Sequence, residues 1–446
     1  MPPLTTLFTN DKRTNWLALP SDVWPFPSKS AIPDEDDLRA LYMSIYRVSL
    51  DDGPAVARSA RLWESLLEKY PKVPFLLITV ADMRWKLGAQ IAALELYKKL
   101  EEVLSLPALE KWLAHYKRQH AIPVTVYKNN HDKFYDPRQL WRSTMENDPL
   151  NMALSVKYPD QEAVERLRTQ PALQHIPDLA DKYRNFMCIH SNAIETTVTL
   201  TGAAVTRLVN VGFYDERSAI EDDEVILECS DVTNGADALL LLRDTHQALR
   251  DAQAFSTSPV IKLTMDTLCE LHKTLMTSSQ IGFRGYTDDE NGPTLKLNYT
   301  HIGRIREGFK MNVTAGSSLV KFKGIQFCPY DSVTKELMWF CGQFNVLLSR
   351  PNVDPFAACA WIHHVFVTIH PFQDGNGRLA RIIGSIPLLR AGLPPLSIPN
   401  THKLNYLDAL NRIRADRHSE TSYLHLMQTM FQGMDSSFTL LGACLP

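Results

Sequence analysis

Apolar side chains recur every three or four positions along most of this 446-residue chain, a spacing that predicts α-helices rather than strands. The segment 36–120 follows this pattern almost throughout, and a further helix is expected from Leu179 to Thr196. The remaining predicted helices cover 234–250, 261–277, 331–349, 354–368, 376–390, 403–415 and 420–433. We therefore expect an all-α fold.

One stretch departs from the helical pattern. Seven of the 19 glycines fall between 280 and 330, and short β-prone pieces lie at 320–322 and 325–327. These pieces flank Lys323 and Gly324, so a small β-hairpin is predicted with its turn at those two residues.

The N-terminal helical segment contains an internal repeat at an offset of 34 residues. A small residue that lets helices approach and an aromatic residue that fills the groove are typical of tetratricopeptide (TPR) helix pairs. Only about two units are found, so ordinary packing of helical hairpins remains the alternative. The matching positions are Ala55 with Ala89, Ser59 with Ala93, Leu62 with Leu96, Trp63 with Tyr97, and Leu66 with Leu100.

The composition argues against a nucleic-acid-binding, zinc-binding or membrane protein. Lys and Arg number 47 against 50 Asp and Glu, a net charge of −3, so no basic field for nucleic acid is expected. The seven cysteines are scattered without a C-x-x-C pair, which favours reduced thiols in the cytoplasm or nucleus and no zinc site. The sequence shows neither a signal peptide nor an apolar run of membrane-spanning length, so no membrane association is expected.

Residues 370–381 read His-Pro-Phe-Gln-Asp-Gly-Asn-Gly-Arg-Leu-Ala-Arg and favour a phosphate site. The turn of Gly375, Asn376 and Gly377 directly precedes a helix, so its backbone N–H groups can form a nest for an anion. Arg378 and Arg381 share one face of that helix, and guanidinium groups suit phosphate oxygens. The alternative is a helix cap with surface arginines.

The same segment contains a metal ligand and a base. Asp374 offers a hard oxygen ligand for a magnesium ion that bridges phosphates. His370 has the one side chain that titrates near neutrality, as a general base requires. The segment as a whole is therefore interpreted as a nucleotide cradle with a base directed at a hydroxyl.

These twelve residues resemble the signature of the Fic (Fido-fold) family, His-x-Phe-x-(Asp/Glu)-Gly-Asn-Gly-Arg-x-x-Arg, at every fixed position. At about 5% usage per residue, a chance match has odds on the order of one in ten billion per window. The segment 303–306 is similar to the family's Gly-x-Tyr-Arg, with Ile305 in place of the aromatic residue, and the resemblance covers roughly 185–435.

The resemblance implies a helical Fic core with a small β-hairpin flap, and transfer of AMP from ATP to a Ser, Thr or Tyr hydroxyl of a target protein. His370 would deprotonate the hydroxyl and Asp374 would hold Mg²⁺. Arg378 and Arg381 would hold the β- and γ-phosphates. The anion hole would consist of Gly375, Asn376 and Gly377, including the Asn376 side chain.

Further roles follow from the same resemblance. The flap (Phe322, Lys323, Gly324 and Ile325) would pair with the target peptide by strand addition. Tyr406 would stack on adenine, although a core position is equally compatible with its sequence. Arg414 stands where many relatives have Asn. The residues on that side of the base pocket therefore remain unassigned.

A built-in brake is also expected. Ser191 and Glu195 match the family's inhibitory motif Ser/Thr-x-x-x-Glu-Gly/Asn, whereas Thr196 departs from its last position. A carboxylate at Glu195 could pair with Arg381 and keep ATP out of the transfer geometry. In relatives of this arrangement the same Glu can orient water that hydrolyses AMP from a modified target.

The leading hypothesis is therefore an autoinhibited protein adenylyltransferase. Removal of AMP at the same site (deAMPylation) and a TPR-type binding scaffold with a regulatory Fic core are the alternatives. Many relatives dimerise, so a homodimer is compatible with the resemblance. The expected domains are an irregular arm (1–35), TPR-like repeats (36–120), linker helices (121–185), the Fic domain (186–435) with the inhibitory helix near 186–200, and a tail (436–446).

Overall fold

The computed structural model describes residues 3–11, 25–119, 135–146, 158–170, 173–257, 262–289, 292–316, 323–416 and 420–445. The chain packs into two units. Unit 1 comprises Met1–Asn130 together with Ser278–Thr300, and unit 2 comprises His131–Thr277 together with His301–Pro446.

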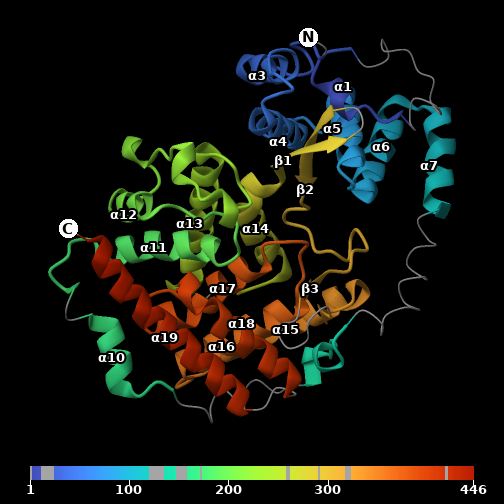
Figure 1. Ribbon diagram of the computed structural model, residues 1–446. Helices are drawn as coiled ribbons and strands as arrows, with labels where there is room; N and C mark the ends of the chain where they lie inside the picture. Colours follow the sequence, from blue (N-terminus) through green and yellow to red (C-terminus); the bar gives the residue numbers. More distant parts are fainter. Residues whose placement is uncertain are drawn as a thin grey trace. The chain divides into compact units, whose positions relative to one another are not determined.

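Unit 1 is a row of helices in which α4 to α7 each pack against the next (Figure 1). Asp52 begins α4 by accepting a hydrogen bond from the Ala55 N–H at 2.9 Å. The repeat positions Trp63 on α4 and Tyr97 on α6 are both fully buried. The TPR identity of these helices stays a prediction. The helices are α1 (Thr5–Phe8), α3 (Glu35–Tyr46), α4 (Gly53–Lys69), α5 (Pro74–Lys86), α6 (Gln90–Leu104) and α7 (Pro107–Gln119).

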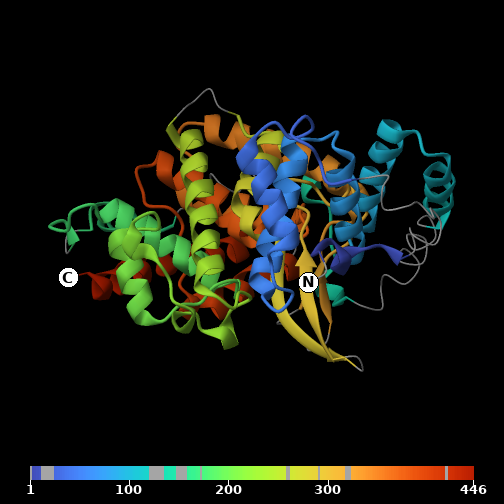
Figure 2. The ribbon, with the colours of Figure 1, turned by 90° about the horizontal axis from the view of Figure 1, so that it is seen from above.

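Unit 1 also contains a β-hairpin from much later in the chain. Strands β1 (Ile281–Asp289) and β2 (Gly292–Tyr299) pair antiparallel, and Figure 2 shows them side by side. Ile281 and Tyr299 are buried in the core of unit 1, and β1 packs against α4. This hairpin was not predicted from the sequence, because its strands are rich in glycine and polar residues.

Unit 2 is helical and is built around α16 (Pro355–Ile369) and α17 (Asn376–Arg390). Helix α16 is apolar on all sides, which requires burial on all sides. Helix α17 packs against α13, α14 and α16 and lies in the middle of unit 2 in Figure 1. The other long helices are α10 (Gln161–Thr169), α11 (Leu179–Ala193), α12 (Gly202–Val211), α13 (Gly235–Thr257), α14 (Met265–Met276), α15 (Val333–Ser349), α18 (Lys403–Ala415) and α19 (Glu420–Cys444).

The predicted fold class is confirmed, since the described residues form helices with two small hairpins. Helix α11 ends at Ala193 rather than at Thr196, which has a φ of 58° outside the helix. Helix α19 runs to Cys444 instead of ending near 433, because Met434, Phe438 and Leu441 continue its buried face. No helix in the described part of the chain is long and apolar enough to cross a membrane.

The second hairpin lies in unit 2 and corrects one prediction. Strand β3 (Thr314–Gly316) pairs antiparallel with β4 (Gly324–Gln326), with Gly316 opposite Gly324. The expected turn at Lys323 and Gly324 is therefore wrong, because Gly324 is already a strand residue. Phe322 and the rest of 317–322 lie outside the described residues.

Candidate active site

The segment 370–375 connects the two central helices of unit 2. His370 ends α16 in the left-handed conformation, with φ 52°, and donates its backbone N–H to the Phe366 carbonyl. Gly375 precedes α17 with φ 75°, a conformation that glycine adopts without steric cost. A Cβ atom there would also lie 2.6 Å from Met276 Sδ. The loop can therefore turn sharply and present the first N–H groups of α17.

The His370 ring is held in the form that a general base needs. Its Nδ1 lies 3.1 Å from the Val367 carbonyl oxygen. Since a carbonyl only accepts hydrogen bonds, Nδ1 carries the proton and Nε2 keeps its lone pair. Burial lowers the pKa of His370 to about 3, and the positive charge of Arg306 acts in the same direction. The imidazole is thus neutral at physiological pH, and the expectation that it titrates near neutrality is corrected, because burial disfavours the charged form.

The Asn376 side chain anchors the loop. Its Oδ1 accepts the Phe372 N–H at 3.0 Å, and its Nδ2 donates to the Phe372 carbonyl at 2.9 Å. Each polar atom has one partner within the loop, and Nδ2 keeps a second N–H, so the contribution of this amide to an anion hole stays a prediction. The backbone N–H groups of the helix start are further candidates for that role.

Two residues outside the motif hold the same loop. His272 on α14 contacts the Asp374 carbonyl, and Arg306 contacts the His370 carbonyl. His272 was not predicted from the sequence, and Arg306 was predicted only as part of the short segment 303–306 that resembles the family. A lone histidine on a helix gives no sequence signal of its own, because its partners lie far along the chain.

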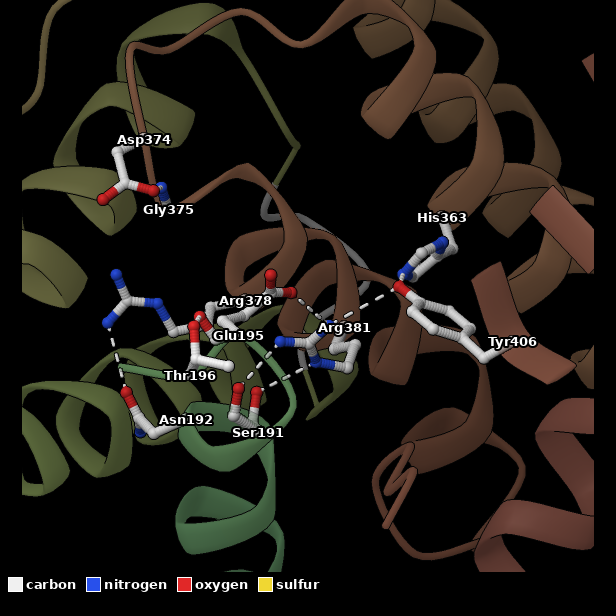
Figure 3. Close-up of polar contacts among 10 residues, drawn as sticks. All are labelled: Ser191, Asn192, Glu195, Thr196, His363, Asp374, Gly375, Arg378, Arg381 and Tyr406. Carbon is white, nitrogen blue, oxygen red and sulfur yellow. Dashed lines mark hydrogen bonds and ion pairs between the residues drawn. The ribbon is translucent and has the colours of Figure 1, made fainter. Parts of the chain in front are cut away.

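The two arginines of α17 are buried and face α11 (Figure 3). Arg378 donates to Asn192 Oδ1 at 3.1 Å and to Met276 Sδ at 3.0 Å. Arg381 donates to Ser191 Oγ at 3.0 Å and to the Ser191 carbonyl at 2.8 Å. Cations near a helix start oppose the helix dipole, so this pair needs an anion nearby.

Glu195 supplies that anion. Its Oε1 lies 2.8 Å from a terminal nitrogen of Arg381, whose side chain is 1% exposed against 39% for Glu195. The same oxygen lies 2.2 Å from where a Cβ of Gly377 would be, so the absence of a side chain there admits the carboxylate. The carboxylate thus takes the place beside Arg381 and the first turn of α17 that was expected for phosphate oxygens. The predicted ion pair is present.

Tyr406 lies behind Arg381 rather than in a base pocket. Its hydroxyl accepts from Arg381 at 3.5 Å and lies 2.8 Å from His363 Nε2. The side chain is 3% exposed. This burial corrects the expectation of stacking on adenine, because neither ring face is open in this arrangement.

The flap contributes an aromatic residue next to the base. Phe327, directly after β4, stacks on the His370 ring with centroids 3.8 Å apart. The Arg414 guanidinium lies 5.6 Å from the centre of the same Phe327 ring. Burial lowers the pKa of Arg414 to about 10. These contacts place a cation and an apolar ring around His370.

One edge of the flap is already covered. Tyr135 forms a parallel bridge to Gly324, and the Asp136 N–H donates to the Gly324 carbonyl at 3.0 Å. Strand β3 has all three residues exposed. Within the described residues, β3 is therefore the edge of this hairpin that remains open to another strand.

Asp374 is the one motif residue suited to a metal. Its carboxylate is exposed, and Oδ1 accepts the Gly375 N–H at 2.6 Å. Among the described residues, no three His, Cys, Asp or Glu side chains gather as a metal site. A single carboxylate still fits Mg²⁺, because this ion is commonly held by one or two carboxylates together with substrate phosphates.

Sequence comparison matches residues 262–388 to the Fic/DOC family. A Fido domain-containing protein of Dictyostelium discoideum is 32% identical over 104 residues, which are 23% of this chain and 72% of that protein. A protein adenylyltransferase Fic of Culex quinquefasciatus is 45% identical over 79 residues, 16% of each protein. Another, of Drosophila virilis, is 23% identical over 366 residues, 82% of this chain and 59% of that protein. The chain thus spans less than two thirds of either adenylyltransferase.

Solved structures of Fic proteins also resemble the chain. A Fic domain-containing signalling protein of Bacteroides thetaiotaomicron has a TM-score of 0.46 at 17% identity, covering 63% of this chain and 96% of that one. A fragment of Fic-1 from Caenorhabditis elegans has a TM-score of 0.40 at 16% identity, covering 92% of this chain and 99% of that one.

Proposed function

The chain belongs to the Fic/DOC family, and from that premise we propose that it is a protein adenylyltransferase, which transfers AMP from ATP to a Ser, Thr or Tyr hydroxyl of a target protein. Relatives named protein adenylyltransferase support nucleotidyl transfer at the level of the family. One observation carries the proposal for this chain. Two buried arginines flank the start of α17, and a carboxylate lies where phosphate oxygens would bind.

In this mechanism the target hydroxyl oxygen attacks the α-phosphorus of ATP. The bond from that phosphorus to the bridging oxygen breaks, and pyrophosphate leaves with the electron pair. His370 Nε2 takes the hydroxyl proton, which its neutral form allows. Arg378 and Arg381 hold the β- and γ-phosphates, and backbone N–H groups from Gly375 to Gly377 stabilise the developing charge.

Asp374 would hold magnesium together with the phosphates. When bound there, the ion supplies charge neutralisation and orientation of the phosphate chain. The protein's own contribution is positioning, because His370 and Asp374 lie on one short loop that Asn376 ties to α17.

Glu195 is proposed as the brake on this reaction. Its carboxylate holds Arg381 and takes the space over Gly377, so the γ-phosphate and Glu195 compete for one place. Removal of the carboxylate leaves Arg381 with Ser191 and Tyr406 and opens the helix start to phosphate.

The test is transfer of label from α-labelled ATP by Glu195→Gly against wild type. We expect a gain of roughly 5- to 150-fold, the usual range of coupling between two competing occupants. Glu224→Gly is the matched control, since Glu224 pairs with Arg207 elsewhere in unit 2. Adding His370→Ala to Glu195→Gly should lower transfer about 10²- to 10⁴-fold. Absence of transfer in Glu195→Gly would refute the proposed function.

Removal of AMP at the same site is the second candidate. The observation that favours it is the partial exposure of Glu195 beside Arg381, which leaves room for a water on the carboxylate. Wild-type protein incubated with an AMP-modified protein should then release AMP, and Glu195→Gly should not. If neither transfer nor release is found, a binding scaffold becomes the better hypothesis.

A further inference from the structure

We propose that His272 and Arg306 are positioning residues, which together with Gly303 form a clamp that fixes the backbone of the catalytic loop at both ends. The effect of these contacts on catalysis rests on the proposed function, whereas the contacts themselves are part of the fold. Neither residue belongs to the signature segment 370–381. His272, Gly303 and Arg306 together form the loop clamp.

Arg306 holds the first end of the loop. Its Nε donates to the His370 carbonyl at 2.6 Å, and one terminal nitrogen donates to the Ile369 carbonyl at 3.1 Å and to the Cys328 carbonyl. Its backbone N–H donates to the Pro371 carbonyl at 2.9 Å. Arg306 is fully buried. One residue therefore fixes the end of α16, the turn after His370 and the segment that follows β4.

His272 holds the second end. The Gly303 N–H donates to Nδ1 at 2.9 Å, so this nitrogen carries no proton. Nε2 must then carry the proton, and it donates to the Asp374 carbonyl at 3.0 Å. The ring stacks on Phe372 with centroids 3.8 Å apart and planes 7° from parallel. His272 thus fixes both the backbone of Asp374 and the ring that anchors the loop.

Gly303 allows the two contacts to exist together. It has φ 63°, and a Cβ there would lie 3.0 Å from Lys273 Cβ and 3.2 Å from the Cys269 carbonyl oxygen. A side chain would push the segment 303–306 away from α14. The clamp therefore joins α14 to the segment that carries Arg306. The catalytic loop accepts hydrogen bonds from both of them.

The chemical consequence is a fixed relation between base and metal ligand. His370 and Asp374 are four residues apart, and the backbone carbonyl of each accepts a hydrogen bond from one clamp residue. Two other contacts hold the middle of the loop: the Asn376 side chain binds Phe372, and the His301 N–H donates to Gln373 Oε1 at 3.0 Å. Without the clamp, the loop keeps its middle anchor but loses the constraint on its two functional residues.

The activity test compares Arg306→Lys and His272→Phe in the Glu195→Gly background. A lysine keeps the charge but not the geometry with which Arg306 reaches four backbone carbonyls, and a phenylalanine keeps only the stacking on Phe372. We expect kcat for label transfer to fall about 10- to 100-fold, as for loss of groups that orient a reactive centre. KM for ATP should stay within about twofold, since Arg378 and Arg381 remain to hold the phosphates.

The structure supplies matched controls. Arg390 in unit 2 also donates to backbone carbonyls, those of Phe255 and Leu348, away from the loop. His364 is another buried histidine, bonded to Tyr423. Arg390→Lys and His364→Phe should leave kcat nearly unchanged. His272→Gln, whose amide can still donate to the Asp374 carbonyl, should recover part of the loss seen in His272→Phe.

A second readout does not depend on activity. Amide hydrogen exchange across 370–377 should rise in Arg306→Lys and in His272→Phe, with exchange in α13 and α19 unchanged. If Glu195→Gly transfers no label, the proposed function fails, yet exchange still tests the clamp. Unchanged exchange across 370–377, or losses of kcat that the control variants share, would overturn the proposal.

Discussion

At the scale of single residues, Arg381 explains why a carboxylate and a phosphate would compete here. Burial by itself would lower the pKa of this guanidinium, yet Glu195 and the hydroxyl of Tyr406 raise it overall. The cation is therefore stable only with an anion beside it. Glu195 is the partly exposed member of the pair, so in the proposed mechanism it is the member that leaves when ATP binds.

Protonation of His370 gives a prediction at the same scale. The folded-state pKa is about 3, well below the ordinary value of 6.5, because the ring is buried near Arg306. The base is therefore already unprotonated throughout the range from pH 8 to pH 5, and acid would remove its function only as the pH approaches 3. We expect the ring resonance of His370 in an NMR titration to stay constant from pH 8 to pH 5.

The resonance is assigned by its loss in His370→Ala. An exposed histidine in the same spectra should shift with a midpoint near pH 6.5, which shows that the titration works. A midpoint above pH 5 for His370 would contradict the buried, neutral ring and its hydrogen bond to Val367.

The sequence predicted those site residues that are neighbours along the chain. The contiguous segment from His370 to Arg381 indicates a candidate phosphate site by its residue types alone, and the ion pair from Glu195 to Arg381 followed from a family resemblance. The roles of Asn376 and Tyr406 could not be predicted, because they depend on which partners the fold brings within hydrogen-bond distance. An asparagine whose side chain binds Phe372 and an asparagine whose side chain binds a phosphate cannot be told apart in a sequence.

At the scale of elements, helices α16 and α17 show why the spacing of apolar residues predicted the helices of this chain. Both have 15 residues with apolar side chains at helical spacing, and they are bounded by Asp354, which caps α16, and by Gly375. Strands β3 and β4 have only three residues each, too few for an alternating pattern to stand out. Gly316 lies opposite Gly324 in this pair, and a glycine next to a lysine is easily taken for a turn.

The flap gives a prediction at the scale of elements. Phe327 is carried by the end of β4 and limits the movement of the His370 ring by stacking on it. Phe327→Leu should lower kcat for transfer in the Glu195→Gly background by about tenfold or more, because displacement of a reacting group by about 1 Å can cost roughly 100-fold. Steady-state kinetics with labelled ATP measures the change.

Phe356→Leu is the control for this variant. Phe356 is fully buried at the other end of α16 and contacts Phe431 edge to face. Both substitutions remove similar apolar volume, so similar losses of thermal stability are expected. An equal loss of kcat in the two variants would show that stability, and not the position of His370, is responsible.

At the scale of the whole molecule, packing does not follow the order of the chain. The segment Ser278–Thr300 leaves unit 2 after α14, contributes β1 and β2 to unit 1, and returns just before the segment that carries Arg306. Sequence patterns favour continuous domains, because periodicity reports local structure and not the partner of a strand. The loop clamp lies on both sides of this excursion, within unit 2.

This arrangement predicts how the chain can be shortened. Deletion of residues 1–130 alone should give an aggregating protein, because it removes the core against which Ile281 and Tyr299 are buried. Deletion of 1–130 together with replacement of 281–299 by Asn-Gly should give a monodisperse unit 2. The join is feasible because the Thr300 N–H already donates to the Gln280 carbonyl at 2.8 Å, as across a two-residue hairpin loop.

Size-exclusion chromatography and thermal unfolding distinguish the two proteins. With Glu195→Gly added, the trimmed unit 2 should transfer label onto itself at a rate close to that of the full chain, because the described motif residues and the loop clamp all lie within it. Labelling of a target protein should fall if the helical repeats select the target and stay constant if they do not. Aggregation of both proteins to the same extent would contradict this prediction. It would show that unit 2 depends on unit 1 for more than burial of the β1–β2 hairpin.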